Sequence, residues 1–383
     1  MRLGALTLAL AAAALLPGCG GSEGAGETTT APGDRLTVYT ALPLQGPGAE
    51  RARDVLDGER LALEQAGDRA GDRRLELRPV SDAAPEDGWQ PGLTVDAARA
   101  AAEDPSTIAF IGDFDAGATA LSLPTTNEAG ILQVSPGATY DGFTGGPGSI
   151  PGEPDKYRPS GVASFGRIPP ADAVQARAIV DVLEERGCRR VAVLSAPNAF
   201  EASLADLIAE EAARAGLRVM LREQVRPDPE AHADAAEEVL AAMVDCAALA
   251  AGPGDLPAAL LQALHAAAPD LRVVAGLNLA DAGVARQLGD AAATTEIVGP
   301  PPAGERLRAA FRRAHGREPG PWAAYGHEAM RRVLDVIKGL GEAGADRAAV
   351  TRAYLERFEP TAALALWRGG PEGLELVRQL PPA

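Results

Sequence analysis

The chain has 383 residues, enough for two domains of ordinary size, and its hydrophobic content of 46% is sufficient to build their cores. Its 53 acidic residues against 36 basic ones give a net charge of −17, which argues against nucleic acid or an anionic membrane surface as a partner. Aromatic residues make up only 4%, so few large rings are available to line a pocket.

The first nineteen residues predict a lipoprotein signal peptide. Leu3–Leu16 is an apolar run that follows Met1-Arg2 and is too short for an ordinary transmembrane helix. It ends in Leu16-Pro17-Gly18-Cys19, which resembles the bacterial lipobox, where the cysteine thiol receives a diacylglycerol. A plain secretory signal with an incidental cysteine is the alternative. We expect a protein that is exported and anchored to the outer face of the cytoplasmic membrane through lipidated Cys19.

Residues 20–34 have no apolar periodicity and predict a flexible linker. After them, strands and helices alternate. Apolar runs and helical periodicity predict strands at 36–40, 75–80, 108–111 and 131–134, and helices at 53–66, 96–103 and 118–129. This order implies a parallel sheet with helices on both faces.

The stretch 108–139 carries the strongest indication of a ligand site. A glycine-rich turn at 112–117 leads into a helix, and Ser135-Pro136-Gly137-Ala138-Thr139 follows the next strand. In an open α/β sheet, ligands bind outside the carboxyl ends of the strands, and the free N–H groups of a helix start favour an anion such as a carboxylate. The alternative is that both loops are ordinary strand–helix connections.

A second α/β unit begins near residue 167. Residues 141–163, rich in glycine and proline, predict a long surface insertion beside the cleft, and 165–168 predicts a crossing strand. Beyond these lie predicted helices at 171–186, 201–215, 231–244 and 256–267, and predicted strands at 190–195, 218–221, 247–251, 273–275 and 296–298. Helices at 307–315, 321–340 and 346–357 precede a hairpin within 363–380.

Four features together resemble the type I periplasmic binding proteins, in the leucine/isoleucine/valine-binding group of ABC-importer receptors. They are the exported lipoprotein start, Pro43-Leu44-Gln45-Gly46, the run from Asn127-Glu128-Ala129-Gly130-Ile131 to Ser135–Thr139, and Tyr325-Gly326-His327-Glu328-Ala329-Met330. The resemblance covers nearly all of residues 35–383, and the order and spacing of the motifs are more specific than any one of them.

The resemblance implies an α/β fold of two Rossmann-like lobes joined by three hinge crossings. Lobe 1 would hold residues 35–165 and 301–358, and lobe 2 residues 166–300 and 359–383. It also implies an extracytoplasmic solute-binding lipoprotein that captures a small polar solute between the lobes and delivers it to the membrane subunits of an ABC permease. We expect a monomer without a cofactor. A ligand-sensing or orphan lipoprotein on the same scaffold is the alternative.

The resemblance also places a set of ligand-binding positions. In the first turn they are Ala116, where relatives have a carboxylate-binding serine, and Gly117 and Ala118, whose N–H groups could face an anion. In the second turn they are Gly137 and Thr139. In lobe 2 they are Phe200, where relatives have a tyrosine, Gly252, where a second aromatic residue is missing, and Asn278, where relatives have an acid that pairs with the ligand's ammonium.

The predicted fold therefore matches the family well. The side chains at the ligand-binding positions match poorly those that bind an amino acid in the family. Either the acid has moved to a neighbour such as Asp281, or the ligand is not a simple zwitterion, and we favour a changed ligand among amino acids and related amides or carboxylates. Asp113 and Asp115 would then meet a polar or cationic group. The alternative is that both carboxylates face solvent at a turn.

Two cysteines lie at the same end of strands that are neighbours in a doubly wound lobe. In an oxidising compartment this favours a disulfide between Cys188 and Cys246, with two separate buried thiols as the alternative. The histidines His232, His265 and His315 are scattered, as is His327, so no metal site is expected. No catalytic motif is present, and we expect no enzyme activity.

Overall fold

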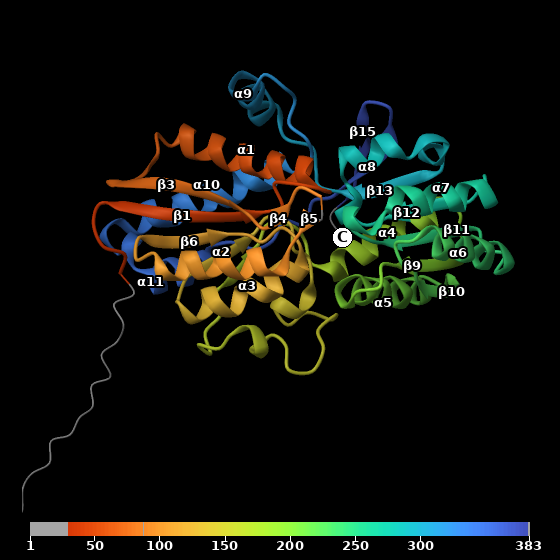
Figure 1. Cartoon of the computed structure of the whole chain (residues 1–383), viewed down its shortest axis with the longest axis horizontal. Coiled ribbons are helices and arrows are strands. Elements are labelled where there is room, and N and C mark those ends of the chain that lie inside the picture. The colour runs from red at the N-terminus through yellow and green to blue at the C-terminus, as the bar shows by residue number, and fades with distance from the viewer. Residues whose placement is uncertain (1–29, 87, 382–383) are drawn as a thin grey trace, which may run out of the picture.

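The computed structural model describes residues 30–86 and 88–381, which form two α/β lobes side by side, each around its own sheet (Figure 1). This is the predicted fold class. The predictions for the signal peptide, for Cys19 and for most of the linker fall outside the described residues. Of the helices in the described part of the chain, none is both long and apolar enough to cross a membrane.

Lobe 1 is built on a six-stranded sheet in the order β2-β3-β1-β6-β7-β8, parallel except for β2. Its strands are β1 (Arg35–Leu42), β2 (Arg69–Ala70), β3 (Arg73–Ser81), β6 (Thr107–Ile111), β7 (Leu132–Ser135) and β8 (Phe165–Arg167). β4 (Ala83–Ala84) and β5 (Gly88–Trp89) form a small antiparallel pair after β3. Every residue of β6 and β7 is buried, as expected for parallel strands covered on both faces.

Helices cover both faces of this sheet. α1 (Ala49–Gln65) packs with α10 (Ala323–Leu340), which contacts α11 (Arg347–Arg357), and α2 (Pro91–Glu103) packs with α3 (Ala116–Glu128). α9 (Glu305–His315) contacts α1 at the edge of the lobe. The late segment of the chain thus returns to complete lobe 1, as the blue helices beside the red ones show (Figure 1).

Lobe 2 is built on a seven-stranded sheet in the order β10-β9-β11-β12-β13-β14-β15. Its strands are β9 (Arg190–Ser195), β10 (Arg218–Gln224), β11 (Cys246–Ala250), β12 (Arg272–Ala275), β13 (Thr295–Gly299), β14 (Ala365–Gly370) and β15 (Gly373–Gln379), of which the last two form an antiparallel hairpin. Its helices are α4 (Asp172–Glu185), α5 (Ala199–Arg214), α6 (Pro229–Ala241), α7 (Pro257–Ala267) and α8 (Ala282–Gln287). Right-handed crossovers in this strand order place α5 and α6 on opposite faces.

β9 and β11, the first and third strands of lobe 2, are parallel neighbours. Cys188 precedes β9 and Cys246 begins β11, and the structure joins them by a disulfide with a Cα–Cα distance of 5.9 Å. The bond ties the start of β9 to the start of its sheet neighbour β11.

The chain passes between the lobes three times, at 168–171, 300–304 and 358–364. The first and third of these segments are hydrogen-bonded to each other, because the N–H of Thr361 donates to the carbonyl of Ile168 over 2.9 Å. The strand predicted at 165–168 is present, but the prediction that it crosses between the lobes, with lobe 2 starting at residue 166, is wrong. Phe165–Arg167 is β8, the edge strand of the lobe 1 sheet, paired with β7, so the crossing begins only after Arg167.

The insertion at 141–163 is a folded part of lobe 1. It contains short 3-10 turns at Asp141–Phe143 and Asp155–Tyr157, and it buries a cluster of aromatic rings made of Tyr140, Phe143, Tyr157 and Phe165. Part of it reaches lobe 2, where the hydroxyl of Ser203 donates to the carbonyl of Gly148 over 3.2 Å.

Two glycines allow α1 and α10 to pack backbone to backbone. A Cβ on Gly58 would lie 2.1 Å from the carbonyl oxygen of Ala323, and a Cβ on Gly326 would lie 2.0 Å from that of Val55. No side chain fits at either distance, so glycine is required at both positions.

Candidate functional site

A cavity of about 730 Å³ lies between the two lobes, a size that suits a small-molecule ligand. Lobe 1 contributes Pro43, Pro47, Arg51, Glu86, Gly88, Trp89, Asp115, Ala116, Gly117, Ala120, Leu121 and Thr139 to its wall. Lobe 2 contributes Asp172, Asn198, Phe200, Glu201, Leu204, Gly252, Pro253, Gly254, Asp255 and Asn278.

The start of α3 forms part of the lobe 1 wall. Asp115 is the residue before the helix, but its side chain makes no capping bond to the helix N–H groups and instead accepts from Arg51 Nη2 over 2.8 Å. Ala116 and Gly117 line the cavity at the first turn, whereas Ala118 is buried and is absent from the wall. The N–H groups of this turn remain available to an anionic group of a ligand.

Asp113 lies beneath this turn and does not reach the cavity. Its carboxylate accepts from the Ser122 hydroxyl and, over 3.4 Å, from Gln133 Nε2. Complete burial raises its pKa well above the usual range, and the neighbouring carboxyl of Asp82 raises it further. The expectation that Asp113 meets a ligand is wrong, and so is the alternative of a solvent-facing carboxylate.

The second turn of lobe 1 contributes Thr139 to the wall, while Gly137 is buried behind it. A Cβ on Gly137 would lie 2.5 Å from the carbonyl oxygen of Phe114, so this glycine lets the two turns of the site pack together. The Thr139 carbonyl accepts from the guanidinium of Arg167 and, over 3.0 Å, from the N–H of Asp172 in lobe 2.

The start of α5 forms the facing wall in lobe 2. Asn198 caps this helix by accepting from the N–H groups of Phe200 and Glu201 over 3.1 and 3.0 Å. The Phe200 ring lines the cavity and packs edge-on against Tyr140 with a centroid distance of 5.0 Å. Phe200 thus lies at the cavity wall, and its covering of a ligand stays a prediction.

Glu201 is a cavity residue that the sequence analysis missed. Its side chain is 8% exposed and accepts from Asn278 Nδ2 over 3.1 Å. Burial raises its pKa to about 8, against the lowering effect of the Asn278 bond, and the nearby carboxyls of Asp172, Asp255 and Asp115 raise it further. The pattern Asn198-x-x-Glu201 resembles a helix capping box, so the sequence alone does not separate a buried acid from a solvent-facing one.

Asn278 lines the cavity, as predicted for the position of the ammonium-binding acid. Asp281, the proposed substitute acid, instead caps α8 by accepting from the N–H of Val284 over 3.0 Å and is absent from the wall. Glu201, which accepts from Asn278, places a carboxyl beside this position.

Gly252 lines the cavity where an aromatic residue was found missing. Its N–H donates to Asp255 Oδ2 over 2.7 Å, which holds a further carboxylate at the wall. The carboxylate of Asp255 thus lies beside the cavity near the position where the aromatic ring is missing.

Arg51 is the second residue that the sequence analysis missed. It lies on α1, is 4% exposed, and its guanidinium stacks over the Phe114 ring at 4.2 Å from the centroid. Its Nη1 donates to the carbonyl of Asn278 over 3.2 Å, so one side chain of lobe 1 binds both Asp115 in its own lobe and the backbone of lobe 2.

A metal site is not indicated. Within residues 30–86 and 88–381, no group of three or more histidine, cysteine, aspartate and glutamate side chains is arranged to hold a metal ion. His327 lies on α10, where Nε2 lies 3.0 Å from Gln65 Oε1, away from the cleft.

Comparison with known proteins places this geometry in a family. Residues 40–363 match the family model of the periplasmic binding proteins. Among curated proteins, no sequence matches the chain.

Solved structures share the fold. A leucine-binding protein, LivK of Thermotoga maritima, is 16% identical, with a TM-score of 0.75 over 91% of this chain and 99% of its own. A solute-binding protein of an ABC transporter from R. palustris, in complex with benzoate, is 18% identical, with a TM-score of 0.74 over 91% of this chain and 97% of its own. LivJ of Streptococcus pneumoniae, in complex with isoleucine, is 15% identical, with a TM-score of 0.68 over 90% of this chain and 99% of its own.

The family and these structural neighbours are solute-binding proteins and not enzymes, in agreement with the expectation from the sequence. The family match covers most of the chain, and the solved structures share its fold over about nine-tenths of its length. The chain belongs to the periplasmic binding protein family and has the type I fold of its leucine-binding branch.

Proposed function

We propose that this protein is the extracytoplasmic receptor of an ABC importer, which captures a small polar solute in the interlobe cavity and delivers it to the permease. The observation that carries the proposal is the composition of the cavity wall, to which both lobes contribute polar side chains. A solute that contacts both walls binds the closed arrangement more tightly than the open one and shifts the population toward it.

The cavity suits an amino compound. N–H groups at the start of α3 can donate to a carboxylate, and Glu201, held by Asn278, faces the same space with a carboxyl suited to an ammonium. Phe200 and Trp89 supply apolar surface between them. Six of the eight positions expected from the resemblance line this cavity, namely Ala116, Gly117, Thr139, Phe200, Gly252 and Asn278.

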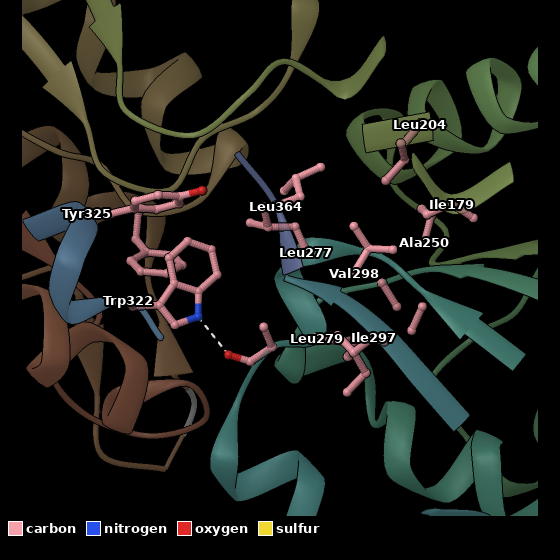
Figure 2. Packing of buried hydrophobic residues seen from close by; sticks show 14 of the residues in the cluster. Ile179, Leu204, Ala250, Leu277, Leu279, Ile297, Val298, Trp322, Tyr325 and Leu364 are labelled. Atoms are coloured by element: carbon pink, nitrogen blue, oxygen red, sulfur yellow. Dashed lines mark hydrogen bonds between the residues drawn. The ribbon is translucent and has the colours of Figure 1, made fainter. Parts of the chain in front are cut away.

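Two contacts between the lobes account for a closed form. Arg51 Nη1 donates to the carbonyl of Asn278, and the indole Nε1 of Trp322 donates to the carbonyl of Ala280 over 2.7 Å (Figure 2). Both acceptors belong to the short segment between β12 and α8, which is one of the places where the two lobes meet.

The experiment that tests capture is isothermal titration of solutes found to co-purify with the protein, with Phe200→Ala as the cleft variant. We expect binding at a stoichiometry of one and a weaker affinity in the variant. Met220→Ala, which removes an exposed side chain from β10 outside the cavity wall, serves as the control. Equal affinity in all three proteins would contradict capture in this cavity.

Delivery is tested separately, by adding the loaded protein to its permease in proteoliposomes. Solute-dependent ATP hydrolysis and uptake support the importer. Tight binding without either result would instead favour a ligand-sensing lipoprotein.

We further propose lipid anchoring through Cys19 and a monomeric state. The basis for the anchor is the lipobox-like sequence Leu16-Pro17-Gly18-Cys19. A Cys19→Ala protein that still partitions with membranes would contradict the anchor, and a dimer mass in light scattering would contradict the monomer.

A further inference from the structure

The cavity wall carries five acidic side chains and one basic side chain. Its ionisable residues are Arg51, Glu86, Asp115, Asp172, Glu201 and Asp255. The single cation is paired with Asp115 over 2.8 Å. Among the described residues, the other four carboxyls have no ion-pair partner within 4 Å.

The buried carboxyls of lobe 2 face the cavity and are not ordinary helix-start charges. Glu201 is more than nine-tenths buried, and while its Oε1 accepts from Asn278, its Oε2 has no hydrogen-bond partner in the described part of the chain. Asp172, at the start of α4, is 3% exposed and accepts from Gln175 Nε2 over 3.1 Å. Neither carboxyl caps its own helix, because the residue before α4 is Ala171, which makes no capping bond, and α5 is capped by Asn198.

Aromatic rings flank the same space. A Cβ on Gly117 would lie 3.4 Å from the Trp89 ring and 3.8 Å from the Phe200 ring, so both rings approach the start of α3. Such rings attract an organic cation through their faces and offer no attraction to an anion there.

On these observations we propose that the cavity selects an amino compound of net positive charge, such as a basic amino acid or a diamine, whose ammonium groups contact Glu201 and Asp172. This inference rests on the proposed capture function and names its substrate class. A neutral zwitterion would leave most of the carboxyls uncompensated, and an aromatic carboxylate would be repelled by them.

The protonation of the wall carboxyls Asp172 and Glu201 provides a second measurement, the release of protons when a solute binds. Burial raises the pKa of Asp172 to about 7 and that of Glu201 to about 8. The charged groups that face Glu201 are Asp172, Asp255 and Asp115, and those that face Asp172 are Asp141, which raises its pKa, and Arg167, which lowers it. A bound cation favours the ionised carboxyls, so binding releases protons and tightens as the pH rises from 6 to 8.5.

The test is calorimetric titration of the full-length chain with lysine, 1,5-diaminopentane, leucine and benzoate. We expect at least one of the two cationic solutes to bind at least tenfold tighter than leucine and benzoate. Tight binding of lysine alone shows that the carboxylate is also recognised, and tight binding of the diamine shows that it is dispensable. Titrations in buffers of different ionisation enthalpy should show proton release near pH 7.

Glu201→Gln keeps the shape and the acceptor for Asn278 but removes the charge. We expect it to weaken cation binding at least tenfold and to reduce proton release, while Glu210→Gln, which removes an exposed charge from the same helix, leaves both unchanged. If leucine or benzoate binds as tightly as the cations, the charge specificity is wrong while capture stands. If no solute of any class binds, capture itself fails.

Discussion

The indole of Trp322 in lobe 1 donates to the backbone carbonyl of Ala280 in lobe 2 over 2.7 Å, and Figure 2 shows this bond at the boundary between the lobes. Trp322 is fully buried and packs on Phe114 with a centroid distance of 4.6 Å. The opposite contact of Phe114 is Arg51, which bonds lobe 2 itself. One buried stack thus supports two bonds between the lobes.

Trp322→Phe should weaken solute binding about fivefold, because one hydrogen bond of about 1 kcal/mol is lost from the closed form only. Calorimetric titration with the bound solute measures this. Tyr39→Phe is the control, since it removes a hydrogen bond that lies within lobe 1, from the Tyr39 hydroxyl to Asp104 Oδ2 over 3.2 Å. An equal loss of affinity in both variants would show that the effect is not specific to the contact between lobes.

Replacing Cys188 and Cys246 together by alanine should destabilise the protein by about 4 kcal/mol, since the bond closes a loop with a sequence separation of 58 residues. Urea unfolding of the variant and of the unreduced protein measures the difference. An intact-mass measurement after thiol alkylation should add no label to these cysteines in the unreduced chain. Two labelled thiols would contradict the bond.

Gly326→Ala should lower the free energy of unfolding by about 1–3 kcal/mol, because the new methyl group would overlap the carbonyl of Val55 and force α1 and α10 apart. Gly339→Ala on the same helix is the control. Its Cβ would meet only a side-chain atom of Arg357 at 3.9 Å, so helix propensity alone should raise stability by up to about 1 kcal/mol. Thermal unfolding of the two variants should therefore shift in opposite directions.

Glu59→Gln should stabilise the protein increasingly as the pH rises from 5 to 8. Glu59 is fully buried, its Oε1 accepts from the Thr40 hydroxyl over 3.2 Å, and burial raises its pKa well above the usual range. Above the unfolded pKa, the unfolded chain releases this proton and the folded chain retains it, so the native protein loses stability with rising pH by about 1.4 kcal/mol per pKa unit of displacement.

The glutamine variant cannot lose that proton, so its stability curve should be flatter than that of the native chain. Glu64→Gln, on the exposed face of α1, should leave the pH dependence unchanged. Parallel unfolding curves for Glu59→Gln and the native chain between pH 5 and 8 would contradict the assignment of a retained proton.

The sheets could be predicted from sequence because their parallel strands are continuous buried apolar runs, such as Thr107–Ile111, separated by helices with clear periodicity. β8 was misassigned because a three-residue edge strand carries too little pattern to show which lobe it joins. The insertion at 141–163 was read as a surface loop because its buried rings lie among glycines and prolines and show no period.

The site could be predicted only in part, for a physical reason. Gly117 and Thr139, which the resemblance places at the site, line the cavity at turns that follow from local sequence. Glu201 and Arg51 were missed because each is buried by a segment distant in the chain, Asn278 lying 77 residues from Glu201 and 227 from Arg51. The residues that neighbour Glu201 and Arg51 in the chain give no indication that Asn278 lies against them.

The three crossings make both lobes discontinuous in the chain. Lobe 1 lacks α9, α10 and α11 until Glu305–Arg357 has been synthesised, and the lobe 2 sheet lacks β14 and β15 until Ala365–Gln379 follows. During translation neither lobe can therefore complete its own core before nearly the whole polypeptide has emerged. An interrupted chain would be left with two unfinished lobes and no working cleft, which makes the intact carboxyl terminus a condition for solute capture.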